Sequence, residues 1–444
     1  MSSGSSGICG SGGPARTLTR VRPYAAPVSD TSTSETPDSP AVTVVRAERL
    51  VAGGAALSRR SDGQIVLVHG AIPGELVEVT IDTRHGADRG TVVEILEPSP
   101  DRVSPACPHV ADGCGGCDLA AFEHVALGQA KVELVTDSLR RLGHWADPVV
   151  RAGPALDPFG FRTTLRLAVS NGRAGLRRAS SNDIVELDHC LVAHPLLDEL
   201  VAEGRFGDAT EVTLRIGAET GERLAMIAPT RTGVLLPDDV RVVGVDELTA
   251  GKRSWMHDVV AGRRWRISAE SFFQTRPDGA AALVDTVASM AADVLDAAPD
   301  DANRTLTLLD AYSGVGLFAG TLLAGRDGWR AVAVESNLSA AADARVNLAD
   351  LSARVITKTV ETMRATRADL VVADPSRAGL GPKAASVLAA SGAPRLILVS
   401  CDPAAAGRDV ALLRALNYQP VESVVVDLFP HTHHTEVVTR FDRG

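Results

Sequence analysis

The chain from about residue 300 to its end alternates between short apolar segments and Ala/Leu-rich segments. The apolar segments are nearly continuous runs of Val, Ile, Leu and Ala: TLTLLD, RAVAVES, ARVITKTV, DLVVADP, RLILVSC, VESVVVDLF and TEVVTRF. Strands that are apolar on both faces and separated by helices are typical of a doubly wound, mostly parallel sheet. Only PHTHH separates the last two runs, and such a short connection requires an antiparallel pair. We therefore predict an α/β domain over residues 271–444, with an antiparallel last strand.

The residues before this domain predict three further parts. Residues 1–40 are rich in Ser, Thr, Gly and Pro, a composition typical of a disordered tail. Residues 41–100 hold short Val/Ile-rich segments separated by Gly, Pro and Asp, which favours a small OB-like β-barrel. Residues 101–270 combine a cysteine cluster, a helical pattern in LAAFEHVALGQAKVELVTDSLRRLGH and further strands. We expect a mixed α+β central domain there.

Charge and hydropathy exclude some classes of protein. The net charge of −10 argues against a protein that coats polyanions over its whole surface, although it allows a local basic face. No run of 18 uncharged apolar residues occurs, so we predict no membrane-spanning helix. The Ser/Gly-rich start lacks the apolar segment of a secretory signal. We therefore expect a cytoplasmic protein whose six cysteines serve thiolate chemistry rather than disulfides.

A Gly-rich turn follows the first predicted strand of the α/β domain, in DAYSGVGLFAG. Gly314 and Gly316 would let the backbone approach a ligand closely. Glu335 ends the second strand, where a carboxylate can bind the hydroxyls of an adenosine ribose. The GxGxxxG spacing differs from the dinucleotide GxGxxG, and no basic residue in the turn could meet a pyrophosphate. These features favour S-adenosylmethionine, and an NAD-dependent oxidoreductase is the weaker alternative.

Three chemically reactive side chains are expected at one edge of the sheet. Asp374 and Cys401 end successive parallel strands, and Glu436 begins the antiparallel last strand, so all three reach the ligand-binding edge. A thiol and a carboxylate suit methylation at C5 of a pyrimidine. The thiolate adds at C6 and makes C5 nucleophilic, and the carboxylate later removes the C5 proton. Such chemistry requires the base to be extruded from its stack.

Four cysteines lie in the predicted central domain: Cys107, Cys114, Cys117 and Cys190. They supply four soft ligands, and their spacing alone leaves zinc and an iron–sulfur cluster open. Two groups of basic residues with interleaved aromatics suit phosphate contacts and base stacking, although charged runs are usually just solvated surface. The first group is Arg162, Arg166, Arg173, Arg177 and Arg178; the second is Lys252, Arg253, Arg263, Arg264 and Arg266, with Trp255 and Trp265.

The chain resembles the RNA 5-methyluridine (uracil-C5) methyltransferase family, in the branch with an N-terminal TRAM domain and an iron–sulfur cluster. The resemblance covers residues 42–444 and rests on motifs in the family's order: GAIPGELVEV, CGGC, SFFQTRPDGAAALV, DAYSGVG, VES, DPSRAGLG, SCDP and PHTHHTE. It implies a class I (Rossmann-like) methyltransferase domain, with Cys401 as the nucleophile and Glu436 as the base. It also implies that S-adenosylmethionine or uracil is contacted by Gln274, Tyr312, Glu335 and Asp374.

The resemblance further implies a [4Fe–4S] cluster on the four upstream cysteines and RNA binding by the TRAM barrel. Ribosomal RNA is the expected target, with transfer RNA as the alternative, and a monomer is the default expectation. Two positions depart from the family, which usually has Asn in place of Asp402 and Pro in place of Ser376. If the Asp402 carboxylate is close and ionised, it should raise the pKa of the neighbouring thiol.

Two further alternatives fit the sequence less well. A non-catalytic RNA-binding protein could retain the fold, but the presence of both Cys401 and Glu436 argues against it. A cytosine-C5 methyltransferase usually needs a second cysteine in the reactive region, and Cys401 is the only cysteine after Cys190.

Overall fold

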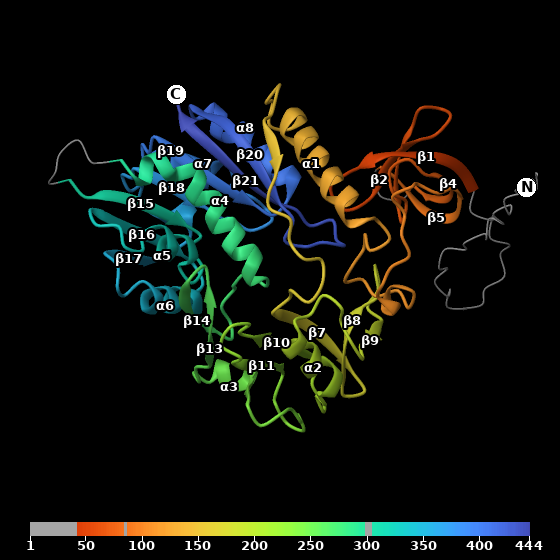
Figure 1. Cartoon of the computed structure of the whole chain (residues 1–444), viewed down its shortest axis with the longest axis horizontal. Helices are drawn as coiled ribbons and strands as arrows, with labels where there is room; N and C mark the ends of the chain where they lie inside the picture. The colour runs from red at the N-terminus through yellow and green to blue at the C-terminus, as the bar shows by residue number, and fades with distance from the viewer. Residues whose placement is uncertain (1–41, 84–86, 298–303) are drawn as a thin grey trace, which may run out of the picture.

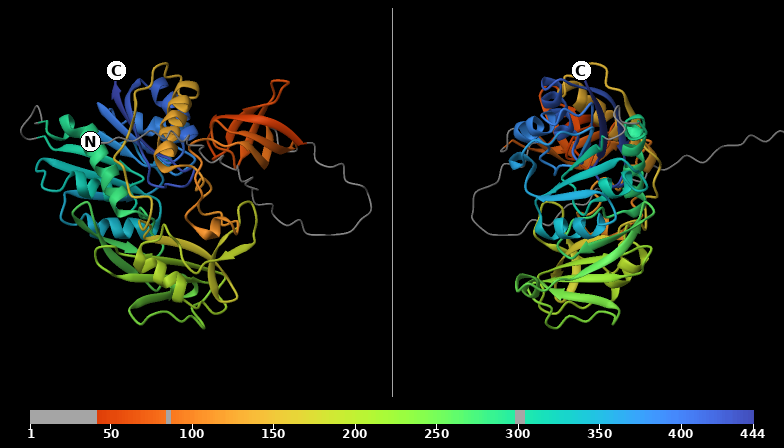
Figure 2. Two further views of the ribbon diagram at one scale, coloured as in Figure 1. Left: turned by 45° about the vertical axis from the view of Figure 1, so that its right-hand side comes forward. Right: turned by 90° about the vertical axis from the view of Figure 1, so that its left-hand side faces the viewer.

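The computed structural model describes residues 42–83, 87–297 and 304–444, so the predicted tail at residues 1–40 lies outside the described residues. Three parts are distinct in Figure 1: a small barrel in red and orange, a central sheet in yellow and green, and a large α/β part in green to blue. The two further views of Figure 2 show the same division. None of the helices in the described ranges is both long and apolar enough to cross a membrane.

The N-terminal part is a closed five-stranded barrel, as the sequence predicts. Its strands follow the order β1-β2-β3-β5-β4. Alternate residues point into it, and the core includes Val45, Val66, Val68, Val77 and Val79. The strand bounds are β1 (Val42–Leu50), β2 (Ala56–Arg59), β3 (Ile65–His69), β4 (Leu76–Asp82) and β5 (Asp88–Glu97).

A loop that carries Cys107, Cys114 and Cys117, called the cysteine loop below, follows the barrel, and a long helix follows the loop. A short 3₁₀ turn, η1 (Pro108–Val110), precedes helix α1 (His124–Arg141). The helix begins later than the apolar pattern indicates because the Glu123 carboxylate caps it, accepting a hydrogen bond from the Ala126 N–H at 2.9 Å. Leu119 and Phe122 instead pack in the loop against apolar residues of the barrel.

The central part is a six-stranded sheet of order β12-β11-β10-β7-β8-β9. Its strands are β7 (Thr164–Ser170), β8 (Arg173–Arg177), β9 (Ile184–Glu186), β10 (Glu211–Ile216), β11 (Arg223–Ala228) and β12 (Val240–Gly244). Two helices accompany it, α2 (Pro195–Glu203) and α3 (Val245–Thr249). A separate hairpin, β13 (Trp255–Val260) and β14 (Arg263–Ser268), packs its buried Trp265 into the core of the α/β part.

The α/β part is built on an eight-stranded sheet of order β17-β16-β15-β18-β19-β21-β20-β6. Strands β15 to β19 are parallel, and β21 is antiparallel to both β19 and β20, as predicted. The strands are β15 (Leu306–Ala311), β16 (Trp329–Glu335), β17 (Ala353–Thr357), β18 (Leu370–Ala373), β19 (Arg395–Ser400), β20 (Tyr418–Val426) and β21 (Glu436–Arg443). A short edge strand, β6 (Val150–Ala152), joins β20 in parallel.

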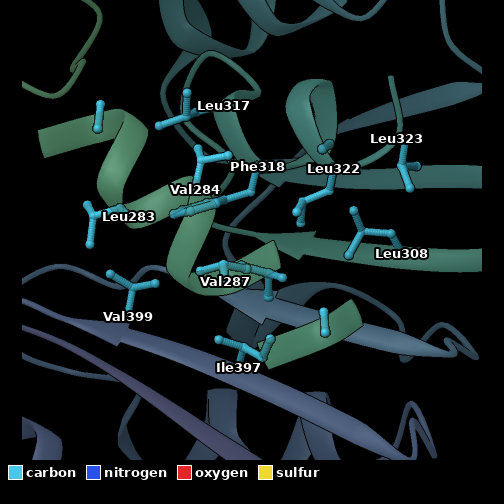
Figure 3. Packing of buried hydrophobic residues seen from close by; sticks show 14 of the residues in the cluster. Leu283, Val284, Val287, Leu308, Leu317, Phe318, Leu322, Leu323, Ile397 and Val399 are labelled. Carbon is cyan, nitrogen blue, oxygen red and sulfur yellow. The ribbon is translucent and has the colours of Figure 1, made fainter. Parts of the chain in front are cut away.

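Helices cover both faces of this sheet. The helices are α4 (Pro277–Leu295), α5 (Leu317–Leu322), α6 (Leu338–Asn347), α7 (Gly381–Ala389) and α8 (Pro403–Ala415), with a 3₁₀ turn η2 (Val360–Thr362). Figure 3 shows the α4 side, where Leu283, Val284 and Val287 meet Leu308 and Ile397 of the strands. Residues of α1, α7 and α8 form the cluster on the other face. The sheet is thus buried on both sides, which leaves its carboxyl edge for ligands.

Candidate active site

A cavity of about 510 Å³ lies at the carboxyl edge of the large sheet. It brings together most of the site residues predicted from the sequence: Gln274, Tyr312, Gly314, Glu335, Asp374, Cys401 and Glu436. Gly316 is an exception, because it does not line the cavity. It stands in the left-handed region at φ 97° before α5, and a Cβ there would lie 3.1 Å from the Leu348 side chain. Gly316 therefore shapes the turn rather than the cavity surface.

The turn after β15 is organised around Glu335. The Gly314 N–H donates a hydrogen bond to Glu335 Oε2 at 2.9 Å, and the Asn337 N–H donates to Oε1 at 2.6 Å. Gly314 has φ 54°, and no heavy atom lies within 4 Å of the Cβ position there. The carboxylate of Glu335 is thus fixed at the cavity wall, beside open space where a ligand can approach the backbone.

Asp310 is a buried acidic residue that was not among the predicted site residues. It is 1% exposed, and its Oδ2 accepts a hydrogen bond from the Ala319 N–H at 2.9 Å. Burial, with Asp374 and Glu335 nearby, raises the pKa of Asp310 to about 7. Its Oδ1 has no protein partner, and neither has the buried hydroxyl of Ser313 in the same turn. These free polar atoms fit a polar ligand such as the amino acid portion of S-adenosylmethionine.

The register of the sheet brings the reactive residues together. Ser400 pairs with Val437 in the β19–β21 ladder, so Cys401 and Glu436 emerge side by side. Burial, with Glu436 and Asp374 nearby, raises the pKa of the Cys401 thiol to about 12. Burial and the charge of Asp374 raise the pKa of Glu436 to about 8. The charge of Arg377 acts to lower the pKa of both Cys401 and Glu436.

Asp402 has a structural role beside the nucleophile. Its carboxylate caps helix α8 by accepting a hydrogen bond from the Ala405 N–H at 2.7 Å. The main causes of the raised pKa of Cys401 are burial, Glu436 and Asp374, rather than Asp402. An asparagine at this position would offer the same capping oxygen, which explains why the acidic residue can stand there.

The four upstream cysteines line a second cavity, of about 420 Å³. All four are free thiols. Burial, with the other three cysteines nearby, raises the pKa of Cys117 to about 12. Within residues 42–83, 87–297 and 304–444, no group of three or more His, Cys, Asp or Glu side chains is placed to hold a metal ion. This cavity shares Phe272, Gln274, Arg377 and Phe429 with the first one, so the two cavities adjoin.

The glycines of the CGGC motif allow the cysteine loop to pack against β8. A Cβ at Gly115 would lie 2.9 Å from the Arg177 carbonyl oxygen, and one at Gly116 would lie 2.8 Å from the Leu176 side chain. Any larger residue would push the loop, and the cysteines on either side, away from the sheet.

Several residues of the predicted basic groups serve the fold. Trp265 is fully buried, and its indole N–H donates to the Val260 carbonyl, so the prediction that it stacks on bases is wrong. Arg173 donates to the Ala202 carbonyl at 2.8 Å, and Arg266 lies over the Trp255 ring. Charge and aromatic content are visible in a sequence, but burial by distant segments is not.

Arg162, from the first basic group, faces the second cavity. Its guanidinium is near Cys117 and Cys190, which favour the charged form, although burial lowers the pKa of Arg162 overall. Its Nε donates to the Thr164 carbonyl at 3.1 Å, and its side chain lies over the Phe429 ring. A half-buried cation beside thiols is a feature that the arginine-rich pattern did not reveal.

The fold is that of the S-adenosylmethionine-dependent methyltransferases. The tRNA (uracil-54, C5)-methyltransferase of Pyrococcus abyssi, solved with S-adenosyl-L-homocysteine, superposes with a TM-score of 0.67. The likeness covers 89% of this chain and 100% of that one at 22% sequence identity, and it shows a shared fold.

Sequence relatives are more specific. An uncharacterised RNA methyltransferase of Streptomyces avermitilis is 35% identical over 87% of this chain and 94% of its own length. Another, of Gloeobacter violaceus, is 31% identical over 89% of this chain and 95% of its own length. No family model matches the chain. At this identity and coverage, the chain belongs to the RNA methyltransferase family.

Proposed function

We propose that the protein transfers a methyl group from S-adenosylmethionine to C5 of a uridine in RNA. The observation that carries this proposal is that Cys401 and Glu436 line the same cavity as Gly314 and Glu335 of the turn. A methyltransferase acting on an oxygen or nitrogen atom has no need of a thiol at this place. A thiol beside a carboxylate meets the requirement of a carbon nucleophile that must first be activated.

The residues divide the reaction between them. Cys401 Sγ, as a thiolate, adds to C6 of the uracil, and the electron pair of the C5–C6 double bond moves toward O4. When bound, S-adenosylmethionine supplies the methyl group that C5 attacks, and its sulfur leaves as a thioether. Glu436 then takes the proton from C5, and the C6–S bond breaks to restore the double bond and the thiolate. Each bond made to the protein is broken again, so the enzyme turns over.

In the resting cavity burial favours the protonated form of Cys401 and of Glu436, so each must lose its proton before it can act. The pKa of Glu436 is raised to about 8 by burial and by Asp374, while Arg377 favours the ionised form. A base with a pKa near the working pH is suited to accept a proton in one step and release it afterwards. Arg377 also favours the thiolate of Cys401, which makes it the cation that opposes burial at this edge.

RNA in which the target uridine is replaced by 5-fluorouridine tests the proposal, because fluorine at C5 cannot leave as a proton. With S-adenosylmethionine present, we expect a covalent protein–RNA adduct in the wild type and none in Cys401→Ala. The matched control is Cys9→Ala, which removes a thiol to which the proposal assigns no role and leaves the nucleophile in place. Absence of an adduct in wild-type protein offered total cellular RNA substituted with 5-fluorouridine would overturn the proposal and favour a non-catalytic RNA-binding protein.

We also propose that the four upstream cysteines hold a [4Fe–4S] cluster. Their position around one cavity, with the Arg162 cation beside two of them, supports a large anionic group. A single zinc ion would need the sulfur atoms about 2.3 Å from one point. Among the described residues no group of three or more ligands is placed to hold an ion, and this applies to a cluster as well as to zinc, so zinc stays the alternative. Iron analysis of protein purified without oxygen tests this; zinc at one per chain without iron would overturn it.

Ribosomal RNA is the target we propose, with transfer RNA as the alternative that the Pyrococcus abyssi neighbour's substrate suggests. Mapping of 5-methyluridine in both RNA classes from a deletion strain distinguishes them. Loss of one ribosomal position is the expected result, and loss of a transfer RNA position alone would reverse the assignment.

A further inference from the structure

The loop after the CGGC motif contacts the connection between β20 and β21, the hairpin that carries Glu436. Asp118 Oδ2 lies 2.7 Å from Nδ1 of His433, and Asp118 Oδ1 accepts a hydrogen bond from the His433 N–H at 3.2 Å. The next residue, Leu119, donates its N–H to the His431 carbonyl at 2.8 Å. Asp118 thus contacts both the ring and the backbone N–H of His433, which lies 315 positions away in the sequence.

The contacts continue from His433 toward the reactive edge. The rings of His433 and His434 are 4.2 Å apart between centroids, and His434 Nε2 lies 3.2 Å from an Arg377 guanidinium nitrogen. Burial, with His433 and Arg377 nearby, lowers the pKa of His434 to about 4. The ring is therefore neutral near pH 7, and its Nε2 can accept a hydrogen bond from the guanidinium.

Arg377 is the end of this path. Arg377 and Asp374, from the segment after β18, and Glu436 from β21 line the same cavity as Cys401. These are the charged groups that act on its thiol. The two carboxyl groups disfavour the thiolate and the guanidinium favours it. Arg377 is itself solvent-exposed, so its position depends on the contacts that hold it.

The barrel covers the start of the path. Gly54, in the turn between β1 and β2, has φ 82°, and a Cβ there would lie 2.6 Å from Asp118 Oδ2 and 3.0 Å from the His433 Cβ. His69 of β3 is also near both residues, since each influences its pKa. Three parts of the chain therefore meet at the Asp118–His433 pair.

We propose that Asp118 is a positioning residue for the reactive edge: through His433 and His434 it holds Arg377 where the guanidinium stabilises the Cys401 thiolate. The role of that thiolate rests on the function proposed above, but the contacts do not. Through the Asp118–His433 pair, the cysteine loop and the barrel influence the reactive residues, although neither part lines the cavity that holds Cys401 and Glu436. An RNA that displaces the barrel or the loop would alter the reactivity of the thiol.

The pH dependence of Cys401 alkylation by iodoacetamide tests this proposal in the full chain, with the modified peptide quantified by mass spectrometry. We expect Asp118→Ala and His433→Ala each to slow alkylation at pH 8 about threefold or more, and to move the profile to higher pH. Because both act on one path, the double variant should be no slower than the slower single variant. Arg377→Gln removes the cation itself, so it shows the largest decrease in alkylation rate that this path can cause.

Asp112→Ala is the matched control. Asp112 lies in the same cysteine loop, but its side chain faces His109 at 3.6 Å rather than the hairpin. In the Asp112→Ala variant, Cys401 should be alkylated at the wild-type rate. Asp118→Asn keeps an oxygen for the His433 N–H and should fall between Asp118→Ala and wild type, which provides a second test if the alanine variant folds poorly.

Two results would overturn the proposal. One is an alkylation profile unchanged in both single variants. The other is a slower rate in Asp118→Ala alone, together with lost iron, since that would place the effect in the cysteine loop. Alkylation requires no RNA. If the wild type forms no adduct with 5-fluorouridine RNA, the proposed function is wrong, but the alkylation measurement still tests the role of Asp118.

Discussion

Ser400 is the register partner of Val437 across the antiparallel β19–β21 ladder. Cys401 follows Ser400, and Glu436 precedes Val437. Both residues therefore leave the sheet at the same end. A parallel last strand would place its first residue at the opposite edge. The reversal of one strand is thus what gives the cavity both a thiol and a carboxylate, on elements whose positions the ladder fixes.

Glu436→Gln should separate the two halves of the reaction. The amide cannot take the C5 proton, so turnover should fall roughly 10²–10⁴-fold while the methylated protein–RNA adduct accumulates on ordinary RNA. Glu422→Gln is the matched control, since Glu422 lies on β20 of the same hairpin and pairs with Arg151. Full turnover by Glu436→Gln would assign the proton transfer to another group.

The rate of a single turnover should rise with pH through about 8, the pKa of Glu436. Both reactive groups work in their deprotonated forms, and burial raises the pKa of each, so alkaline conditions increase the active fraction. Rapid-quench measurements at fixed saturating RNA and cofactor follow this directly. A rate that declines between pH 7 and pH 9 in folded protein would contradict the assignment.

Asp374→Asn should stabilise the protein at alkaline pH. The folded pKa of Asp374 is raised by burial from 3.8 to about 7, so the folded chain keeps a proton that the unfolded chain releases. This linkage lowers stability as pH rises from 3.8 to about 7, by about 1.4 kcal/mol for each unit of pKa difference. Asparagine cannot ionise, so the melting temperature should rise at pH 8 and be little changed at pH 4. A lower melting temperature at pH 8 would show that the ionised carboxylate is favourably paired.

Much of this fold could be predicted because its signals are local and periodic. The apolar runs of the large sheet, the turn at Gly314 and the acidic end of β16 at Glu335 each lie within a few residues of sequence. The antiparallel last strand followed from the length of one connection. The site was then assembled from the rule that parallel strands end at one edge.

Other features depend on contacts between distant segments. Strand β6 has three residues and exists because it pairs with β20, more than 250 positions away. Trp265 looks like an exposed aromatic between arginines, yet the α/β core buries it. Asp118 carries no motif of its own, and only the folded chain places it against His433. Burial and pairing of this kind are tertiary properties that periodicity does not encode.

Cys190→Ser should release the iron of the cluster proposed for the second cavity. A serine is a poor ligand in place of a thiolate, so protein purified without oxygen should lose its iron and its brown colour. Cys401→Ser is the matched control, because it removes a thiol from the first cavity and should keep the iron content of the wild type. Equal iron in both variants would place the metal elsewhere or show that it is adventitious.

Glu335→Gln should weaken binding of S-adenosylmethionine with a smaller effect on the methyl transfer step. The carboxylate holds two backbone N–H groups, of Gly314 and Asn337, and the proposed ribose contact would add charge-assisted hydrogen bonds. An amide offers one acceptor oxygen instead of two, so KM for the cofactor should rise about tenfold or more, which corresponds to about 1.4 kcal/mol. Glu199→Gln is the control, because Glu199 of α2 pairs with Arg223 and does not line the cavity. Isothermal titration of cofactor into each variant measures the difference directly. Unchanged affinity in Glu335→Gln, or tight binding of NAD by the wild type, would show that the turn recognises a different ligand.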